Sequence, residues 1–218
     1  MARPRKDDSR DTRQGILDRA LDLFAEHGFY GTSMRQIARA VGVRESALYH
    51  YFPSKQAIFH ELTRDLGPGR MIQLASVDVS AMTEALGVEG VLRQLLDVLI
   101  TTWSTPQERK LFRVMVSEGL RLDAEGVIHP PQVMRKLRAI AAGLFRQFIE
   151  KKLIRPVDPE AAALALMGPL MLLRVMYLAM PSQEMDFKGL KVEVDRHVAF
   201  FWESVKPLTD ARPRRHAS

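Results

Sequence analysis

The sequence predicts an all-α protein in two helical parts. Apolar residues recur at helical spacing along most of the 218 residues, and no segment shows the apolar-polar alternation of a half-buried strand. The strongest break in this pattern is Leu66-Gly67-Pro68-Gly69, where two glycines flank a proline that cannot donate a helical hydrogen bond. Short helices are expected before this break and longer ones after it, so we place a domain boundary or hinge there.

Length and composition indicate a folded protein rather than a disordered chain. Its 46% hydrophobic and 27% charged residues lie near the globular average, and the length suits one domain or two small ones. The 32 Lys and Arg residues outnumber the 26 Asp and Glu residues, and the net charge of +6 favours a polyanionic partner, either nucleic acid or an anionic membrane surface. The lack of cysteine excludes disulfide scaffolds, thiolate nucleophiles and cysteine-based metal sites.

Two segments bear on where the protein resides. The first ten residues are charged where an export signal needs an apolar run, so a cytoplasmic location is expected. Residues 161–180 are apolar and long enough to span a bilayer, but Arg174 would cost about 2.5–3.5 kcal/mol in mid-span. We therefore expect a helix buried within or between subunits and no membrane partner.

The first two helices are predicted from their end signals. Apolar spacing gives a helix over about 12–27, with Gly28 as a plausible C-cap. Ser33 and Gln36 form a capping-box pattern that starts a second helix, and Gly42 ends it.

A third short helix is expected after Val43 and before Pro53, and Ser54 can cap a fourth through Leu62. Beyond the hinge, apolar periodicity and prolines at first turns predict longer helices over 88–104, 106–122, 130–153, 159–180 and 187–205. The predicted organisation is a flexible basic arm (1–11), a first helical domain (12–66), a second helical domain (70–206) and a disordered basic tail (207–218).

The segment 32–52 has the physical parts of a helix-turn-helix. Ala38 is small where two helices must cross closely, and Gly42 can take the left-handed conformation of the turn. A small core between the two helices is expected from four apolar residues, Ile37, Val41, Val43 and Leu48. That leaves a polar and aromatic set facing outward, which suits a DNA major groove.

Two cations stand at helix starts, where the helix dipole disfavours them by about 0.3–1 kcal/mol. Arg44 precedes the second helix of the motif, and Lys55 opens the helix that follows. These positions are understandable if a phosphate docks there and meets the cation and the backbone N–H groups together. The alternative is a pair of solvated surface cations.

The segment 16–59 resembles the DNA-binding domain of the tetracycline-repressor (TetR) family of bacterial transcription regulators. The resemblance covers about a fifth of the chain and rests on Ile16-Leu17, Ala20-Leu21, Phe24, Gly28, Gly31-Thr32-Ser33, Ile37-Ala38, Gly42-Val43 and Leu48-Tyr49-His50-Tyr51-Phe52-Pro53-Ser54-Lys55. It implies a homodimer that places the helix over 44–51 in the major groove of each half of a near-palindromic operator. It also implies that the C-terminal helices bind a small ligand and form the dimer.

Carried over position by position, the resemblance implies two kinds of contact with DNA. Base contacts or close approach are implied for Arg35, Arg44, Glu45 and Ser46. Phosphate contacts are implied for Ser33, Tyr49, His50, Tyr51 and Lys55.

The chain departs from the family pattern within this set. Arg44 stands where members often have Ser or Thr, and Ser46 where Gly or Pro is frequent, so no operator sequence can be transferred. A guanine near Arg44 is expected in each half-site, with a phosphate contact as the alternative. The basic arm over 3–6 could add minor-groove contacts or be a solvated tail.

The ligand site in the second half is predicted from large apolar and sulfur-containing residues, which suit an adaptable apolar pocket. Ordinary core packing is the alternative for each of them. Arg174 could anchor a ligand or pair at an interface with Glu193 or Asp195. The candidate ligand residues are Trp103, Phe112, Met115, Met134, Phe145, Met167, Met171 and Arg174.

The dimer interface is predicted on the last two helices, whose wide apolar faces suit a four-helix bundle built from two subunits. The candidate interface residues are Leu170, Leu173, Tyr177, Val194, Val198 and Phe201.

No catalytic constellation is expected, and neither a cofactor nor a metal. His60-Glu61 begins like a zinc-protease helix, but Arg64 stands where the second His is needed. The sequence therefore predicts a ligand-responsive transcriptional regulator, most simply a repressor that a mostly apolar small molecule releases from DNA, although an activator stays open. The alternatives are an architectural protein that binds DNA without sequence preference and a partner-binding helical bundle with no DNA role.

Overall fold

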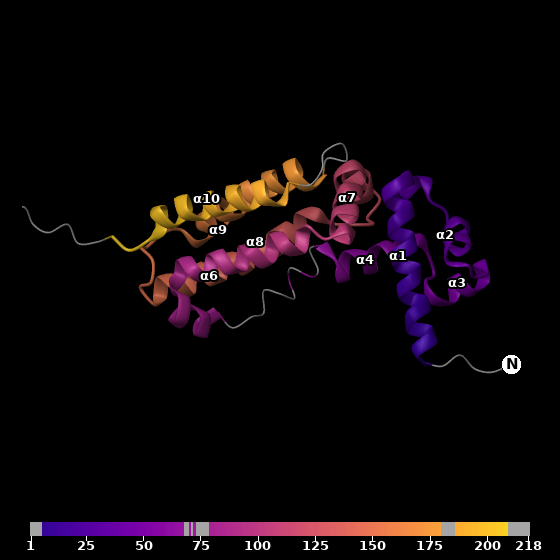
Figure 1. Cartoon of the computed structure of the whole chain (residues 1–218), viewed down its shortest axis with the longest axis horizontal. Coiled ribbons are helices and arrows are strands. Elements are labelled where there is room, and N and C mark those ends of the chain that lie inside the picture. Colours follow the sequence, from indigo (N-terminus) through magenta and orange to yellow (C-terminus); the bar gives the residue numbers. More distant parts are fainter. Residues whose placement is uncertain (1–5, 68–69, 71, 73–78, 180–185, 209–218) are drawn as a thin grey trace, which may run out of the picture.

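The computed structural model describes residues 6–67, 70, 72, 79–179 and 186–208. The described residues form helices and connecting turns and contain no strand, so the predicted all-α fold is confirmed. The helices make an elongated bundle with a group of shorter helices at one end (Figure 1).

The group at this end consists of α1 (Lys6–Gly31), α2 (Met34–Val41), α3 (Glu45–Tyr51) and α4 (Lys55–Asp65). We call the group the short helices, although α1 itself has 26 residues, because α2 to α4 have only 7 to 11. The path of α1 kinks at Gly28, whose positive φ of 77° fits the cap predicted there. The helix begins at Lys6, so the predicted flexible arm over 1–11 is wrong for residues 6–11. Residues 1–5 lie outside the described residues.

The predicted end signals of α2 and α4 are confirmed by their hydrogen bonds. Ser33 Oγ accepts from the Gln36 backbone N–H at 3.2 Å, and the Gln36 side chain accepts from the Ser33 N–H at 2.7 Å. Gly42 ends α2 in the left-handed conformation at φ 80°. Ser54 Oγ accepts from the Ala57 N–H at 3.1 Å, which fixes the start of α4.

The longer helices are α6 (Val79–Trp103), α7 (Pro106–Ala124), α8 (Pro130–Glu150), α9 (Pro159–Arg174) and α10 (Phe187–Val205). Prolines lie in the first turns of α7, α8 and α9, as predicted. The expected helix over 159–180 changes character after Arg174 and continues as a π-helix, η1 (Val175–Ala179).

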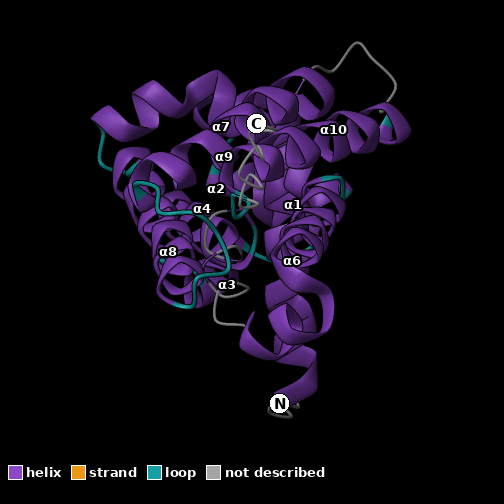
Figure 2. Cartoon of the chain, turned by 90° about the vertical axis from the view of Figure 1, so that its left-hand side faces the viewer, coloured by secondary structure: helices purple, strands orange, loops and turns teal. Residues whose placement is uncertain are grey.

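The long helices pack into one bundle beside α7. In the end-on view of Figure 2, α6 and α8 lie on opposite sides of the bundle. The helix α9 packs against α8 and α10, and α10 packs against α6. One described helix, Pro159–Ala179, is long and apolar enough to cross a membrane by length and composition, with 33% of its most apolar window buried. Its packing against α8 and α10 accounts for part of this apolar surface.

Two apolar cores divide the molecule at a place that differs from the predicted boundary. One core joins α6 with α8, α9 and α10. The other is built from α1 to α4, yet it also contains Leu111, Val114 and Leu122 of α7. In sequence, α7 falls within the predicted second domain (70–206), but its buried apolar residues belong to the core of the short helices.

Polar contacts reinforce this junction between α1 and α7. Lys110 donates to Asp22 at 2.6 Å, and Glu118 accepts from the backbone N–H of Phe29 at 3.0 Å. The guanidinium of Arg121 lies 3.5 Å from the ring centroid of Tyr30. The helix α7 therefore connects the short helices to the bundle.

Candidate DNA-binding face and ligand cavity

The crossing of α2 and α3 is set by a small core and a tight turn. Ile37 and Leu48 are fully buried, and Ala38 is buried where the two helices meet. The N–H groups of Gly42 and Val43 both donate to the Ala38 carbonyl at 3.0 Å, which closes the turn. The helix-turn-helix geometry predicted from these residues is therefore present.

Most of the predicted DNA-binding residues share the outer face of this motif. Arg35, Arg44, Glu45, Ser46, Tyr49 and His50 are exposed, Ser33 is exposed at the α2 N-terminus, and Tyr51 is half-buried. Arg44 occupies the N-cap position of α3 and makes no side-chain cap hydrogen bond. Neither Arg35 nor Arg44 takes part in an ion pair within the described ranges.

Lys55 does not share this free surface. Its Nζ donates to the backbone carbonyls of Phe29 at 2.5 Å and Thr32 at 2.7 Å, and it lies 4.3 Å from the Phe29 ring centroid. Burial lowers the pKa of this ammonium, with neighbouring carboxylates opposing the shift. Two of the three donors of the Lys55 ammonium are thus engaged by backbone carbonyls near the end of α1, which sequence spacing could not show. Its phosphate contact stays a prediction.

Two further polar residues on this face are absent from the predicted set. Gln36 and Arg39 of α2 are exposed, and Arg39 lies one turn after Arg35. The i, i+4 spacing of the two arginines was the available signal.

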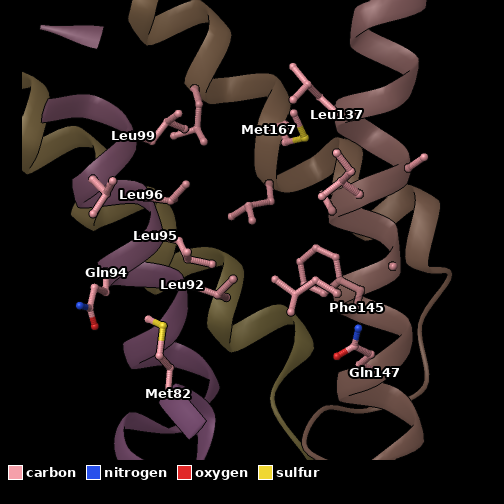
Figure 3. Close-up of a pocket in the computed structure, with 18 residues that line it drawn as sticks. Met82, Leu92, Gln94, Leu95, Leu96, Leu99, Leu137, Phe145, Gln147 and Met167 are labelled. Carbon is pink, nitrogen blue, oxygen red and sulfur yellow. The ribbon is translucent and has the colours of Figure 1, made fainter. Parts of the chain in front are cut away.

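A cavity of about 480 Å³ opens between α6, α8 and α9 (Figure 3). The labelled leucines of α6 face Leu137 and Phe145 of α8, while Met167 approaches from α9. Its lining contains no charged residue, and the amides of Gln94 and Gln147 are its principal polar side-chain groups. The lining includes Met82, Leu92, Leu95, Leu96, Leu99, Leu137, Ile140, Leu144, Phe145, Leu166, Met167 and Leu170.

A smaller hollow of about 250 Å³ adjoins this cavity at Met167. Two arginines of α8, Arg135 and Arg138, stand at its edge, and Arg138 is paired with Glu160 at 3.1 Å. Met134 and Met171 also line it.

The structure divides the predicted ligand residues among four places. Phe145 and Met167 line the large cavity, and Met134 and Met171 line the small hollow. Met115 packs against the core of the short helices. The α6 leucines were missed, because an amphipathic helix shows the same spacing whether its apolar face meets a core or a cavity. The remaining residues, Trp103, Phe112 and Arg174, form a stack outside both cavities.

Arg174 is an interior residue rather than an interface charge. It is 5% exposed and donates to Glu108 of α7 at 3.2 Å, so the predicted pairing with Glu193 or Asp195 is wrong. Asp195 instead lies 3.5 Å from Arg93. Burial lowers the pKa of Arg174 to about 10, while Glu108 opposes the shift.

The predicted dimer residues lie on the inner faces of α9 and α10. Leu170, Val194, Val198 and Phe201 are buried within the single chain, and Leu173 and Tyr177 are half-buried against the same core. Buried side chains offer no surface to a partner, so the prediction is corrected for Leu170, Val194, Val198 and Phe201, while it stays a prediction for Leu173 and Tyr177. The exposed apolar residues of the two helices are Leu164, Leu172, Met176, Val192 and Phe200.

No catalytic or metal site emerges among the described residues. Within those ranges no group of three or more His, Asp or Glu side chains could hold a metal ion. Glu61, which resembled a zinc-protease glutamate in sequence, pairs with Arg13 and Arg64.

The fold and the exposed α2–α3 face define a two-part helix-turn-helix protein. Residues 16–62 match the family model described as "Bacterial regulatory proteins, tetR family". The HTH-type transcriptional regulator AcrR of Shigella flexneri is 45% identical over 62 residues, covering 28% of this chain and 29% of AcrR. RutR of Escherichia coli K12 is 25% identical over 152 residues, covering 68% of this chain and 66% of RutR.

Solved structures show the same fold over most of the chain. The SmeT–triclosan complex aligns with a TM-score of 0.70 and 21% identity, covering 90% of this chain and 92% of SmeT. Another structure describes SmeT as the repressor of the Stenotrophomonas maltophilia multidrug efflux pump SmeDEF. Residues 16–62 thus match the DNA-binding part of the TetR family, and the chain shares its overall fold with the solved structures. The curated relatives are named as transcriptional regulators.

Proposed function

We propose that this protein is a cytoplasmic, ligand-responsive transcriptional repressor that binds a palindromic operator as a homodimer. The observation that carries the proposal is the outer face of α2 and α3, where the cations Arg35, Arg39 and Arg44 are exposed. Cations on a stable surface without intramolecular partners favour a polyanion. The face is built on rigid, capped helices, which suits a defined position in a groove.

The DNA contacts we propose divide by the chemistry of the side chains. Arg44 can pair bidentately with the O6 and N7 of a guanine, and Glu45 can accept from a cytosine amino group. Ser33, Tyr49, His50 and Tyr51 can donate to phosphates, which fixes the orientation of α3 without reading sequence.

A second copy of the chain is the proposed partner for the outer apolar stripe of α9 and α10. Leu172 is 62% exposed and Phe200 is 76% exposed, although both belong to long packed helices. Covering this stripe with its symmetry mate would make a four-helix bundle. The two α3 helices would then need a separation of about 34–36 Å to enter successive major grooves.

The proposed effector is a small, largely apolar and uncharged molecule. The large cavity has the size of a drug-like ligand site, and a charged ligand would lose its hydration there without finding an ion partner. The triclosan bound by SmeT, a protein of the same fold, supports an effector of this kind.

Selection of bound sequences from random duplex DNA tests the proposal without knowledge of the effector. We expect enrichment of a palindrome with half-sites one helical turn apart, containing a guanine that Arg44→Ala no longer selects. Arg44→Ala should weaken binding to the selected palindrome by about 1–3 kcal/mol, whereas the matched control Arg146→Ala on the exposed side of α8 should not. Equal binding to selected and random duplexes that falls steeply with salt would support the architectural alternative instead.

A further inference from the structure

The carboxylate of Glu108 joins three segments that are far apart in sequence. Its Oε1 accepts from the backbone N–H of Gly67 at 2.5 Å, just after α4. Its Oε2 accepts from Arg174 Nη2 at 3.2 Å, at the end of α9. Glu108 itself lies in the first turn of α7, where the helix dipole favours a negative charge. We call Gly67, Glu108 and Arg174 the three-residue bridge.

The bridge is almost completely enclosed. Glu108 is 1% exposed and Arg174 is 5% exposed. The guanidinium of Arg174 lies between two aromatic rings, 4.5 Å from the Trp103 centroid and 4.0 Å from the Phe112 centroid. Water therefore screens the ion pair little, and a displacement of either partner changes its energy strongly.

The hydrogen bonding of the bridge is incomplete. The buried Nε of Arg174 and the buried Nε1 of Trp103 have no partner among the described residues. Burying an ion pair is weak evidence for stability, since apolar residues of similar volume often replace such pairs without loss. The presence of a buried ion pair that lacks some hydrogen-bond partners therefore needs an explanation other than stability. A pair whose contacts change between two conformations of the protein provides such an explanation.

One end of the bridge adjoins the large cavity. Leu170, one helical turn before Arg174, lines the cavity together with Leu166 and Met167 of the same helix. Regular α-helix ends at Arg174 and the π-helix η1 follows, which is the irregularity expected where a helix can change register. A molecule that displaces Leu170 would therefore also displace Arg174.

The other end of the bridge adjoins the short helices. Gly67 is buried with a positive φ of 58°, and a Cβ there would meet Leu111 of α7 at 3.4 Å. Its amide follows directly on the last turn of α4, which packs on α1. Leu111 in turn belongs to the core that holds α1 to α4. Movement of the Gly67 amide is thus movement of the end of α4.

We infer that Glu108 and Arg174 are positioning residues that couple occupancy of the large cavity to the position of α4 and hence of the DNA-binding face. Filling the cavity displaces α9 and with it Arg174. Because Arg174 is paired with Glu108, the carboxylate of Glu108 moves as well, and the Gly67 amide follows the carboxylate oxygen to which it donates. The part of this inference that concerns DNA rests on the proposed function. The part that concerns the link from cavity to Gly67 does not.

The Gly67 amide provides a readout that is independent of DNA. Spectra of the full-length protein labelled with ¹⁵N-glycine resolve its 13 glycines, and the peak lost in Gly67→Ala assigns Gly67. The cavity is filled with the neutral fluorophore N-phenyl-1-naphthylamine and, independently of any ligand, by the substitution Ala141→Phe on its wall. We expect the fluorophore and Ala141→Phe each to shift the Gly67 resonance by more than its line width. Arg174→Met should abolish these shifts. The resonance of Gly126 is the control and should not shift in any sample.

The coupling to DNA is measured on the palindrome obtained by selection. In the unsubstituted protein, filling the cavity should weaken operator binding by about 5–150-fold. Arg174→Met should reduce this factor to within about twofold of unity. The control Lys191→Met breaks an exposed ion pair of 2.6 Å between α10 and α6 and should leave the coupling factor unchanged. If Arg174→Met does not fold because Glu108 is left buried without its partner, the double variant Arg174→Met, Glu108→Gln removes both charges.

The outcomes separate the inference from the proposed function. A Gly67 amide that stays still when either occupant fills the cavity would overturn the link, as would equal shifts in the unsubstituted and Arg174→Met proteins. A moving amide in a protein that selects no DNA sequence would support the link and reject the operator. Coupling to DNA that persists in the folded Arg174 variants would show that the signal takes another route.

Discussion

The helix-turn-helix and the C-terminal bundle place their side chains under different constraints. In α2 and α3, two short helices share one small core around Ile37, Ala38 and Leu48, so most of the polar residues are turned toward solvent by geometry. In α9 and α10, apolar residues cover several faces, and these faces meet a core, a cavity or open solvent. An apolar pattern in the sequence therefore predicts how much of a helix is covered but not what covers it.

The largest effect on the free energy of unfolding is expected for a substitution in the core of the short helices. Phe59 is fully buried and lies 5.8 Å and 5.2 Å from the ring centroids of Phe24 and Phe29. Phe59→Ala should lower the free energy of unfolding by about 3–5 kcal/mol, because it leaves a cavity among rings that cannot close it. Chemical denaturation measures this, with Leu120→Ala at a 93% exposed position as the control expected within about 0.5 kcal/mol. A loss below 1 kcal/mol would mean that this core repacks freely.

A smaller effect is expected on the outer stripe of the bundle. Phe200→Asp should weaken self-association by about 2–4 kcal/mol, because a charge replaces an aromatic anchor at the proposed interface. Sedimentation equilibrium should show monomers at concentrations where the unsubstituted protein is dimeric. Leu208→Asp, at a 79% exposed position beyond α10, is the matched control and should remain dimeric. An unchanged dimer in Phe200→Asp would place the interface on another face.

The smallest effect sharpens the distinction between structural and DNA-facing cations. Lys55→Met should cost about 1–3 kcal/mol of stability, because the carbonyls of Phe29 and Thr32 lose their donor. It should leave the salt dependence of operator binding unchanged. Arg35→Met should do the reverse, with unaltered stability and a salt slope reduced by about 1 if Arg35 meets a phosphate. A stable Lys55→Met protein with a reduced slope would instead support the phosphate contact predicted for Lys55.

The sequence was most informative where one residue type has one structural use. A capping box requires a hydroxyl and an amide three residues apart, and a left-handed turn residue favours glycine, so Ser33, Gln36 and Gly42 could be placed from sequence. The helix starts at Pro106, Pro130 and Pro159 followed for the same reason, because proline fits a first turn without loss of a hydrogen bond. Pro169 inside α9 is an exception to this preference.

The sequence was least informative where chemistry permits several partners. The carboxylate that pairs with Arg174 lies 66 residues away, and nothing local distinguishes Glu108 from Glu193. A DNA contact is predicted for Lys55 because the sequence shows its charge but not the backbone carbonyls to which its ammonium donates. The buried and outward faces of α9 both carry leucine and methionine, so no periodicity could separate Leu170 from Leu172.

The packing of α7 into the core of the short helices has a consequence for protein engineering. Exchanging DNA-reading heads between related regulators is commonly attempted by cutting at the linker, here between Leu66 and α6. A graft made at that junction would separate Phe24 and Ile58 from residues of the same apolar core, namely Leu111, Val114, Leu122 and Val127. A chimera therefore has to take α1 to α4 and the inward-facing residues of α7 from the same parent protein. The unit that can be exchanged is discontinuous in the chain.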